Sequence, residues 1–268
     1  MSGAVAMTDE SPSIARILVA FDSASSAANL MDAAAGLALG LQAELACLLV
    51  EDEQLVRLAA LPFARELGVA SARSRPLDQE ELARSLRAQA ERVRSLVAST
   101  AKRLSLSWSL QIVRGQMMEA ALSRSSEADL LVLGRSRYRP AHASPSRHVR
   151  SLAHRPVAVL FDGSEASLRA LYYAHTLARV LGSPLLAIIP AAGAEAFRQK
   201  RDEAARRLQS LGGAAASYLS VSGVRPEFIE GTVRERHVSV LVWPQRARTE
   251  DADLSLLERL SCPVVLHG

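Results

Sequence analysis

Short apolar runs alternate with longer amphipathic segments along most of the chain. The runs at 14–21, 45–50 and 157–161 are almost continuously apolar, which is typical of strands buried on both faces of a parallel sheet. The segments between them carry apolar residues at helical spacing, as at Leu30 and Leu37. This alternation predicts an α/β fold built from right-handed βαβ units.

The first half of the chain predicts four strands, with helices between them. In order, we expect a strand at 14–21, a helix through 30–41, a strand at 45–50, a long helix from 76 to 104, a strand at 108–112, a helix at 117–125 and a strand at 128–134. Any of three serines, Ser23, Ser25 or Ser26, could cap the first helix.

Residues 51–75 have no counterpart in the second half. Leu55, Leu58 and Phe63 predict a short amphipathic segment, and 70–76 predicts a loop whose final proline suits the first turn of the next helix. The sequence leaves open whether this insertion covers a site in the first half as a lid.

The second half repeats the same design in shortened form, since Phe161-Asp162 aligns with Phe21-Asp22. We expect a strand at 157–161, a helix through 168–181 ended by Gly182, a strand at 185–189, a helix at 195–211, and strands at 228–231, 238–243 and 263–267. The strand at 228–231 is predicted because it matches 112–115, and it leaves room for about one helical turn before 238.

Composition indicates an ordinary globular protein, with 49% hydrophobic and 22% charged residues. The net charge is +4, but aromatic residues make up only 4%, too few for a base-stacking surface, so nucleic-acid binding is not favoured. Cys47 and Cys262 lie in apolar runs without metal-ligand spacing, and we expect buried thiols and no metal. Neither a signal peptide nor an apolar run of membrane-spanning length is recognisable, which predicts a cytoplasmic protein that does not bind membranes.

Three kinds of motif recur along the chain: a strand followed by Asp-x-Ser and a helix, a strand that ends in glycine, and an apolar closing strand. They fall at Asp22, at Asp162 to Ser164, at 113–115, at 229–231, at 128–134 and at 262–266. Together they resemble the universal stress protein family in its tandem form. The resemblance implies two Rossmann-type, adenine nucleotide α-hydrolase-like domains, each a doubly wound parallel sheet of five strands, over 1–154 and, shortened, 155–268. It also implies that the two domains pack as an intramolecular pseudo-dimer, and a further homodimer is compatible with it.

One stretch departs from the family pattern. In the family each domain ends with its own closing strand, but here 155–160 matches a closing strand and runs straight into Asp162, which opens the second domain. We predict that this strand opens the second domain and leaves the first with four core strands of its own.

The candidate site lies where parallel strands end, at the switch point of the sheet. Nucleotide-binding members of the family carry a Gly-x-x-Gly loop after the fourth strand, because glycine lets backbone N–H groups approach phosphate. By resemblance, Asp22 would contact the adenine or ribose and Gly134 would begin that loop. Only this first glycine of the pattern is present, because Arg137 replaces the second and Arg147 a later one.

In the second half Pro244 replaces even the first glycine, which leaves only Asp162 as a ligand candidate. Asp22 and Asp162 are equally well explained as acids favoured by the positive end of a helix dipole. In the first half, arginine side chains at Arg135, Arg137 and Arg147 could hold phosphate where the backbone cannot, although a solvated run of charge accounts for them as well.

The incomplete glycine pattern in both halves favours a non-enzymatic stress-response sensor or scaffold with degenerate nucleotide-binding loops. We expect it to bind no cofactor and to act through protein partners that the sequence does not identify. No acid–base pair or nucleophile elbow is recognisable, so no catalytic residue is assigned. Ser164 is expected to cap a helix, and His175 to be a packing or surface histidine. One alternative is ATP binding by the first domain alone. Another is polyanion or nucleic-acid binding through the basic loop 135–150.

Overall fold

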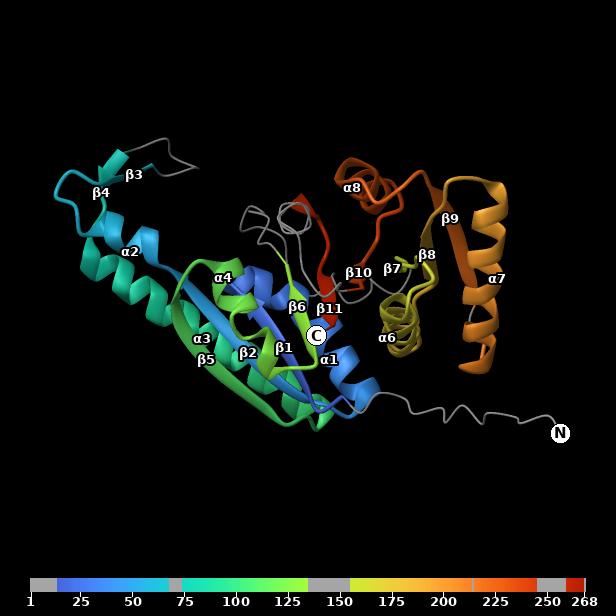
Figure 1. Ribbon diagram of the computed structural model, residues 1–268. Coiled ribbons are helices and arrows are strands. Elements are labelled where there is room, and N and C mark those ends of the chain that lie inside the picture. The colour runs from blue at the N-terminus through green and yellow to red at the C-terminus, as the bar shows by residue number, and fades with distance from the viewer. Residues whose placement is uncertain (1–13, 68–73, 135–154, 214, 245–258, 268) are drawn as a thin grey trace.

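The computed structural model describes residues 14–67, 74–134, 155–213, 215–244 and 259–267. Nine strands form one continuous sheet in the order β5-β2-β1-β6-β11-β10-β7-β8-β9 (Figure 1). The strands are β1 (Arg16–Phe21), β2 (Glu44–Asp52), β5 (Trp108–Gly115), β6 (Leu130–Leu133), β7 (Val157–Leu160), β8 (Leu185–Pro190), β9 (Ala216–Val221), β10 (Val240–Trp243) and β11 (Val264–His267). The predicted α/β class is confirmed.

The two halves of the sheet repeat one strand order. In the first half β5, β2, β1 and β6 lie side by side, and in the second β9, β8, β7 and β10 follow the same sequence of neighbours. All these pairs are parallel. Among the described strands of this sheet, the one antiparallel pair joins β11 to β6, with Val265 opposite Val132. The sheet therefore passes from one half to the other through β11.

Strand β7 belongs to the second half, as predicted, because it pairs with β8 and β10. The first half contributes four strands to the described sheet, and the position beside β6 is taken by β11 from the far end of the chain. The boundary at 154/155 stays a prediction, since it adjoins residues outside the described ranges.

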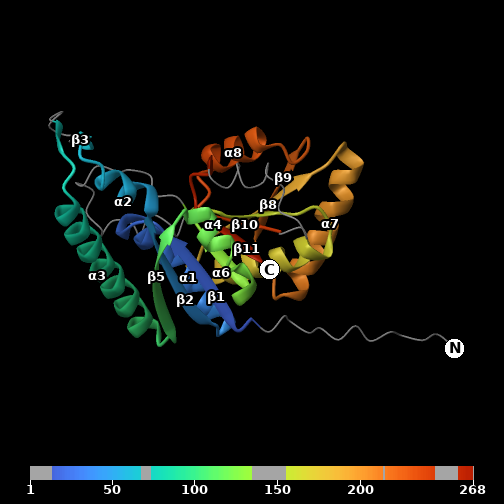
Figure 2. The same ribbon diagram turned by 60° about the vertical axis from the view of Figure 1, so that its left-hand side comes forward.

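Helices cover both faces of the sheet (Figures 1 and 2). Four of them pack on one face: α1 (Ala24–Leu41), α3 (Gln79–Leu104), α6 (Glu165–Leu181) and α7 (Ala194–Ser210). The other face is covered by α4 (Met117–Leu122), with the 3₁₀ turn η1 (Ser125–Glu127) after it, and by α8 (Pro226–Glu235). Both faces of the sheet are thereby buried, which explains why its strands are apolar runs without alternation.

The first helix of each half begins at a serine. Ser23 caps α1, where its Oγ accepts a hydrogen bond from the Ser26 N–H at 3.2 Å while the Ser26 Oγ accepts one from the Ser23 N–H. Ser164 caps α6 in the same way, accepting from the Ser167 N–H at 3.2 Å. Gly182 ends α6 with φ 63°, the left-handed conformation that glycine adopts without strain. These capping predictions are confirmed, with Ser23 the capping residue of the three candidates.

The two halves also meet through α1 and α6, which pack against each other. A Cβ placed on Gly36 would lie 3.1 Å from Leu177 Cδ1, and one on Gly40 would lie 2.6 Å from Thr176 Cγ2. Glycines one helical turn apart thus let the two helices approach closely. With the β6–β11 pair, this contact makes the two halves one body.

The insertion after β2 builds an arm at the end of the molecule shown at the left of Figure 1. It holds α2 (Glu53–Ala59) and a small antiparallel hairpin of β3 (Arg65–Leu67) and β4 (Ser74–Pro76). The predicted loop at 70–76 is therefore partly strand. Pro76 lies in β4, and the long helix begins three residues later at Gln79, capped by Asp78. The amphipathic segment predicted from Leu55, Leu58 and Phe63 does not bury these side chains: all three are exposed, Phe63 by 76%.

The predicted strand at 228–231 is wrong. These residues lie in α8, a helix of 10 residues, so the helix before β10 is not clipped to one turn. The buried residues Ile229 and Val233 are four apart, which is helical spacing, and Pro226 occupies the first turn. The true counterpart of β5 is β9, which pairs with β8 as β5 pairs with β2.

Candidate functional site

The candidate site lies at the carboxyl ends of β1 and β6. These neighbouring strands pair in parallel with Val19 opposite Val132, so Asp22 and Gly134 each follow the last residue of adjacent strands. The chain leaves β1 toward β2 on one side and returns to β6 on the other, which makes this the switch point of the first half. The structure thus brings together the two residues that the sequence marked.

Asp22 is exposed at the start of α1 and is held by its neighbours. The buried Ser26 donates its hydroxyl to Asp22 Oδ1 at 2.8 Å, and Gln89 of α3 donates its side-chain amide to the Asp22 carbonyl at 3.0 Å. A carboxylate at this position is stabilised by the positive end of the helix dipole. The aspartate therefore has a structural role, and its side chain still faces solvent beside the strand ends.

Gly134 has a packing reason to be glycine. A Cβ at this position would lie 2.6 Å from Cδ2 of Leu30, a residue of α1 that is only 1% exposed. Strand β6 thus ends in close contact with the helix that follows β1. The three arginines predicted to act with Gly134, namely Arg135, Arg137 and Arg147, lie outside the described residues, as does the whole basic loop 135–150.

At the equivalent position in the second half, the aspartate side chain is hydrogen-bonded within its own turn, and a proline follows the neighbouring strand. The Asp162 Oδ1 accepts a hydrogen bond from the Ser164 N–H at 2.9 Å, which ties the carboxylate into the turn before α6. Gly163 adopts φ +86° within that turn. Strand β10 is followed by Pro244, which is buried and has no N–H to donate to a ligand.

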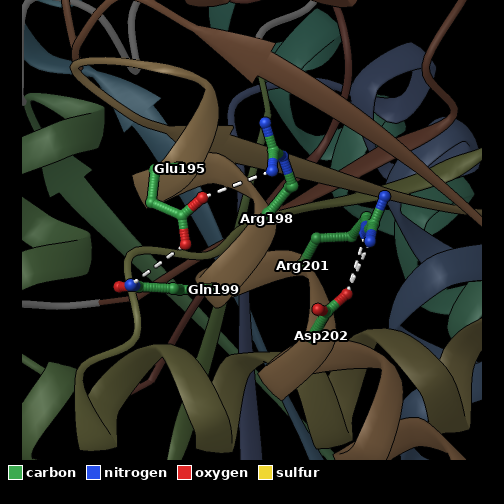
Figure 3. Close-up of polar contacts among 5 residues, drawn as sticks. All are labelled: Glu195, Arg198, Gln199, Arg201 and Asp202. Carbon is green, nitrogen blue, oxygen red and sulfur yellow. Dashed lines mark hydrogen bonds and ion pairs between the residues drawn. The ribbon is translucent and has the colours of Figure 1, made fainter.

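Charged and polar side chains pair with one another along α7, the helix that follows β8 (Figure 3). Glu195 contacts Arg198 at 3.4 Å and Gln199 at 3.5 Å, and Asp202 accepts from Arg201 at 2.8 and 2.9 Å. All five side chains lie on the surface of one helix, where such pairs stabilise by only about 0.5 kcal/mol. They form a solvated charged face rather than a site.

The histidine and the two cysteines discussed in the sequence analysis are buried. His175 is 3% exposed, and its Nε2 lies 3.2 Å from the Leu211 carbonyl; burial lowers the pKa of this histidine, while the Leu211 bond opposes the shift. Cys47 and Cys262 are buried thiols, as expected, and burial raises the pKa of Cys47 to about 12. Each of these residues packs in the core rather than at the strand ends.

A hollow that sequence reasoning did not find lies beside the outer strands, between α2 and α3. Its lining comes from residues 51–60, from 79–87 and from Arg114, segments that are far apart in sequence.

Within the described ranges, no cluster of three or more potential metal ligands is present. The described helices likewise include none with the length and apolarity to cross a membrane.

Comparison with solved structures indicates the family whose fold this chain shares. No family model and no curated protein matches the chain. A solved universal stress protein from Archaeoglobus fulgidus DSM 4304 is similar over 96% of this chain and 97% of its own, with 15% identity and a TM-score of 0.56. A putative universal stress protein from Pseudomonas aeruginosa UCBPP-PA14 covers 97% and 95% respectively, with 17% identity and a TM-score of 0.49.

The strand order and the switch point define a doubly wound α/β protein with two repeated halves. The similarity to the Archaeoglobus structure covers both halves, so the chain has the universal stress protein fold. The resemblance drawn from its motifs is confirmed at this level, even though the strand-glycine motif at 229–231 proved to be helical.

Proposed function

We propose that this protein is a non-enzymatic, universal-stress-type sensor or scaffold whose nucleotide-binding edges have become degenerate. The proposal includes the cytosolic location and the protein partners expected from the sequence. It assigns the two strand-end regions a mainly structural role, because the marked residues there already serve local packing and capping.

The observation that supports this best is the end of β10. A phosphate at the switch point of the second half would need backbone N–H donors after this strand. Pro244 offers none, and the neighbouring Asp162 carboxylate is engaged by the Ser164 N–H. The second half therefore lacks the donor at the position where a backbone phosphate site would begin.

A second candidate function is ATP binding by the first half alone. What favours it is the placement of Asp22, exposed and adjacent to Gly134 at the first switch point. A ligand hydroxyl or base could approach this carboxylate from solvent. The arginines after Gly134 would then supply the charge that binds phosphate.

Isothermal titration of the full chain with Mg-ATP separates the two candidates, together with a nucleotide assay on the protein as isolated. We expect no saturable heat and no retained nucleotide in the parent protein. Saturable binding near one nucleotide per chain, lost in Asp22→Ala and kept in the matched Asp162→Ala variant, would replace the proposal with ATP binding by the first half. Binding lost equally in both variants would contradict both candidates.

A further inference from the structure

The hollow between α2 and α3 has the dimensions and lining of a ligand site. Its volume is about 370 Å³, at the lower end of the range of about 300–1,000 Å³ found for small-molecule pockets. One wall is apolar, formed by Val56 and Ala59 of α2 and by Leu82 and Leu86 of α3. Both leucines are half-buried, because α2 covers them without filling the space.

The charged residues that line the hollow are Arg87, Arg114 and Glu51. Arg114, at the end of β5, donates from Nε to the Glu51 carboxylate at 3.3 Å; the arginine side chain is 65% exposed and that of Glu51 only 12%. Arg87 of α3 donates from Nε to the Ala83 carbonyl at 3.2 Å. Each arginine thus uses its Nε for a contact within the protein, and its terminal NH₂ groups make no hydrogen bond to the described residues. With two guanidinium groups and one carboxylate, the lining of the hollow carries a net positive charge.

We propose that this hollow, the α2–α3 groove, binds a small amphipathic monocarboxylate. The apolar body of the ligand lies against Leu82, Leu86 and Val56, and its carboxylate is held by Arg87 and Arg114. Guanidinium groups bind carboxylates through paired, charge-assisted hydrogen bonds, and an apolar wall removes the hydrocarbon part of the ligand from water. A cation would be repelled by the net positive lining, and a neutral amphiphile would offer no carboxylate to the terminal NH₂ groups of the two arginines.

This site is separate from the candidate nucleotide site. Its strand residues, Glu51 and Arg114, come from the carboxyl ends of β2 and β5, and Asp22 and Gly134 are not among its lining residues. The inference goes beyond the proposed function and does not rest on it, since a sensor with or without nucleotide can carry a second small-molecule site. Titration with decanoate and titration with Mg-ATP therefore fail or succeed independently.

The test is calorimetric titration of the full chain with decanoate, kept below its micellar concentration, beside decan-1-ol and decyltrimethylammonium as neutral and cationic probes. We expect saturable binding of one decanoate per chain, at least about tenfold tighter than either control, and weaker at high salt. Arg87→Gln should weaken binding about tenfold. Arg84→Gln is the matched control, because Arg84 also donates its Nε to a carbonyl of α3 but does not line the groove.

A second pair of variants tests the groove by filling it. Ala83 and Ala88 are both exposed on α3, but only Ala83 lines the groove, so Ala83→Phe should abolish decanoate binding and Ala88→Phe should not. Circular dichroism and the urea midpoint verify that each variant is folded. The proposal is overturned by the absence of saturable decanoate binding, by equal affinity for the three probes, or by equal effects of the matched variants. It is also overturned if Ala83→Phe leaves decanoate binding intact and instead dissociates a dimer, since the groove would then be an interface between copies.

Discussion

Gly134 gives the sharpest test of how the first switch point is built. A Cβ added there would lie 2.6 Å from Leu30 Cδ2, which is about 0.9 Å closer than the ~3.5 Å of an ordinary carbon–carbon contact. Leu30 is 1% exposed, so it has no solvent to move into. Overpacking of this kind costs about 1–3 kcal/mol, and the loss of glycine's freedom in the unfolded chain returns only about 0.4–1 kcal/mol. We therefore expect Gly134→Ala to reduce the free energy of unfolding by about 1–2 kcal/mol.

Urea unfolding without any nucleotide measures this cost. The matched control is Gly231→Ala in the interior of α8, where an added Cβ meets nothing within 4 Å and the helix gains about 0.5–1 kcal/mol. The two alanines should shift the midpoint in opposite directions. A Leu30→Ala change combined with Gly134→Ala should cost less than the sum of the two single changes, because the clash and the cavity offset each other.

A Gly134→Ala variant as stable as the parent would refute the packing argument. The glycine would then serve a purpose that appears only with a ligand present, and the ATP-binding candidate would gain support. Additive effects of the Leu30 and Gly134 changes would refute it as well, since residues that do not touch have no coupling energy.

Two further predictions concern buried titratable groups. Burial lowers the pKa of His175 below its ordinary value of 6.5, so near that pH the unfolded chain binds a proton that the folded chain does not. The free energy of unfolding should therefore fall as the pH drops from about 6.5 through the folded-state pKa. In urea unfolding, His175→Gln should lose less stability than the parent between about pH 7.5 and about pH 5.5. An equal loss in parent and variant would assign that pH dependence to other groups. Burial raises the pKa of Cys47 to about 12, and Cys262 is buried as well. Neither thiol should therefore react with a disulfide reagent in the native protein, and both should react after unfolding in guanidinium. Fast reaction of the native protein would contradict the buried placement of these two residues.

The sequence by itself determined most elements of this fold. Strands buried on both faces must be continuously apolar, and β1, β2, β7 and β8 were recognisable for that reason. Local capping was equally clear, because Ser164 and Gly182 act on backbone groups a few residues away. The candidate pair Asp22 and Gly134 also followed from sequence, since parallel strands place their carboxyl ends at one edge.

Sequence failed where several local patterns competed. A four-residue match to 112–115 favoured a strand at 228–231, but such a short apolar run is ambiguous, and the spacing of Ile229 and Val233 together with Pro226 decides for helix. The arm after β2 was misjudged for a related reason. Its hairpin and exposed leucines are held by few long-range contacts, so no buried face imposed a periodic pattern.

Tertiary structure alone decided how the halves join and where the groove lies. No local sequence pattern predicts that β11 pairs antiparallel with β6. Nor does one predict that the glycines of α1 at 36 and 40 contact Leu177 and Thr176 of α6. The groove likewise combines a helix after β2, the start of α3 and the end of β5. Sequence patterns report the periodicity of one segment and the caps of its ends, whereas these contacts depend on the order of strands in the sheet, which only the packing of the whole chain fixes.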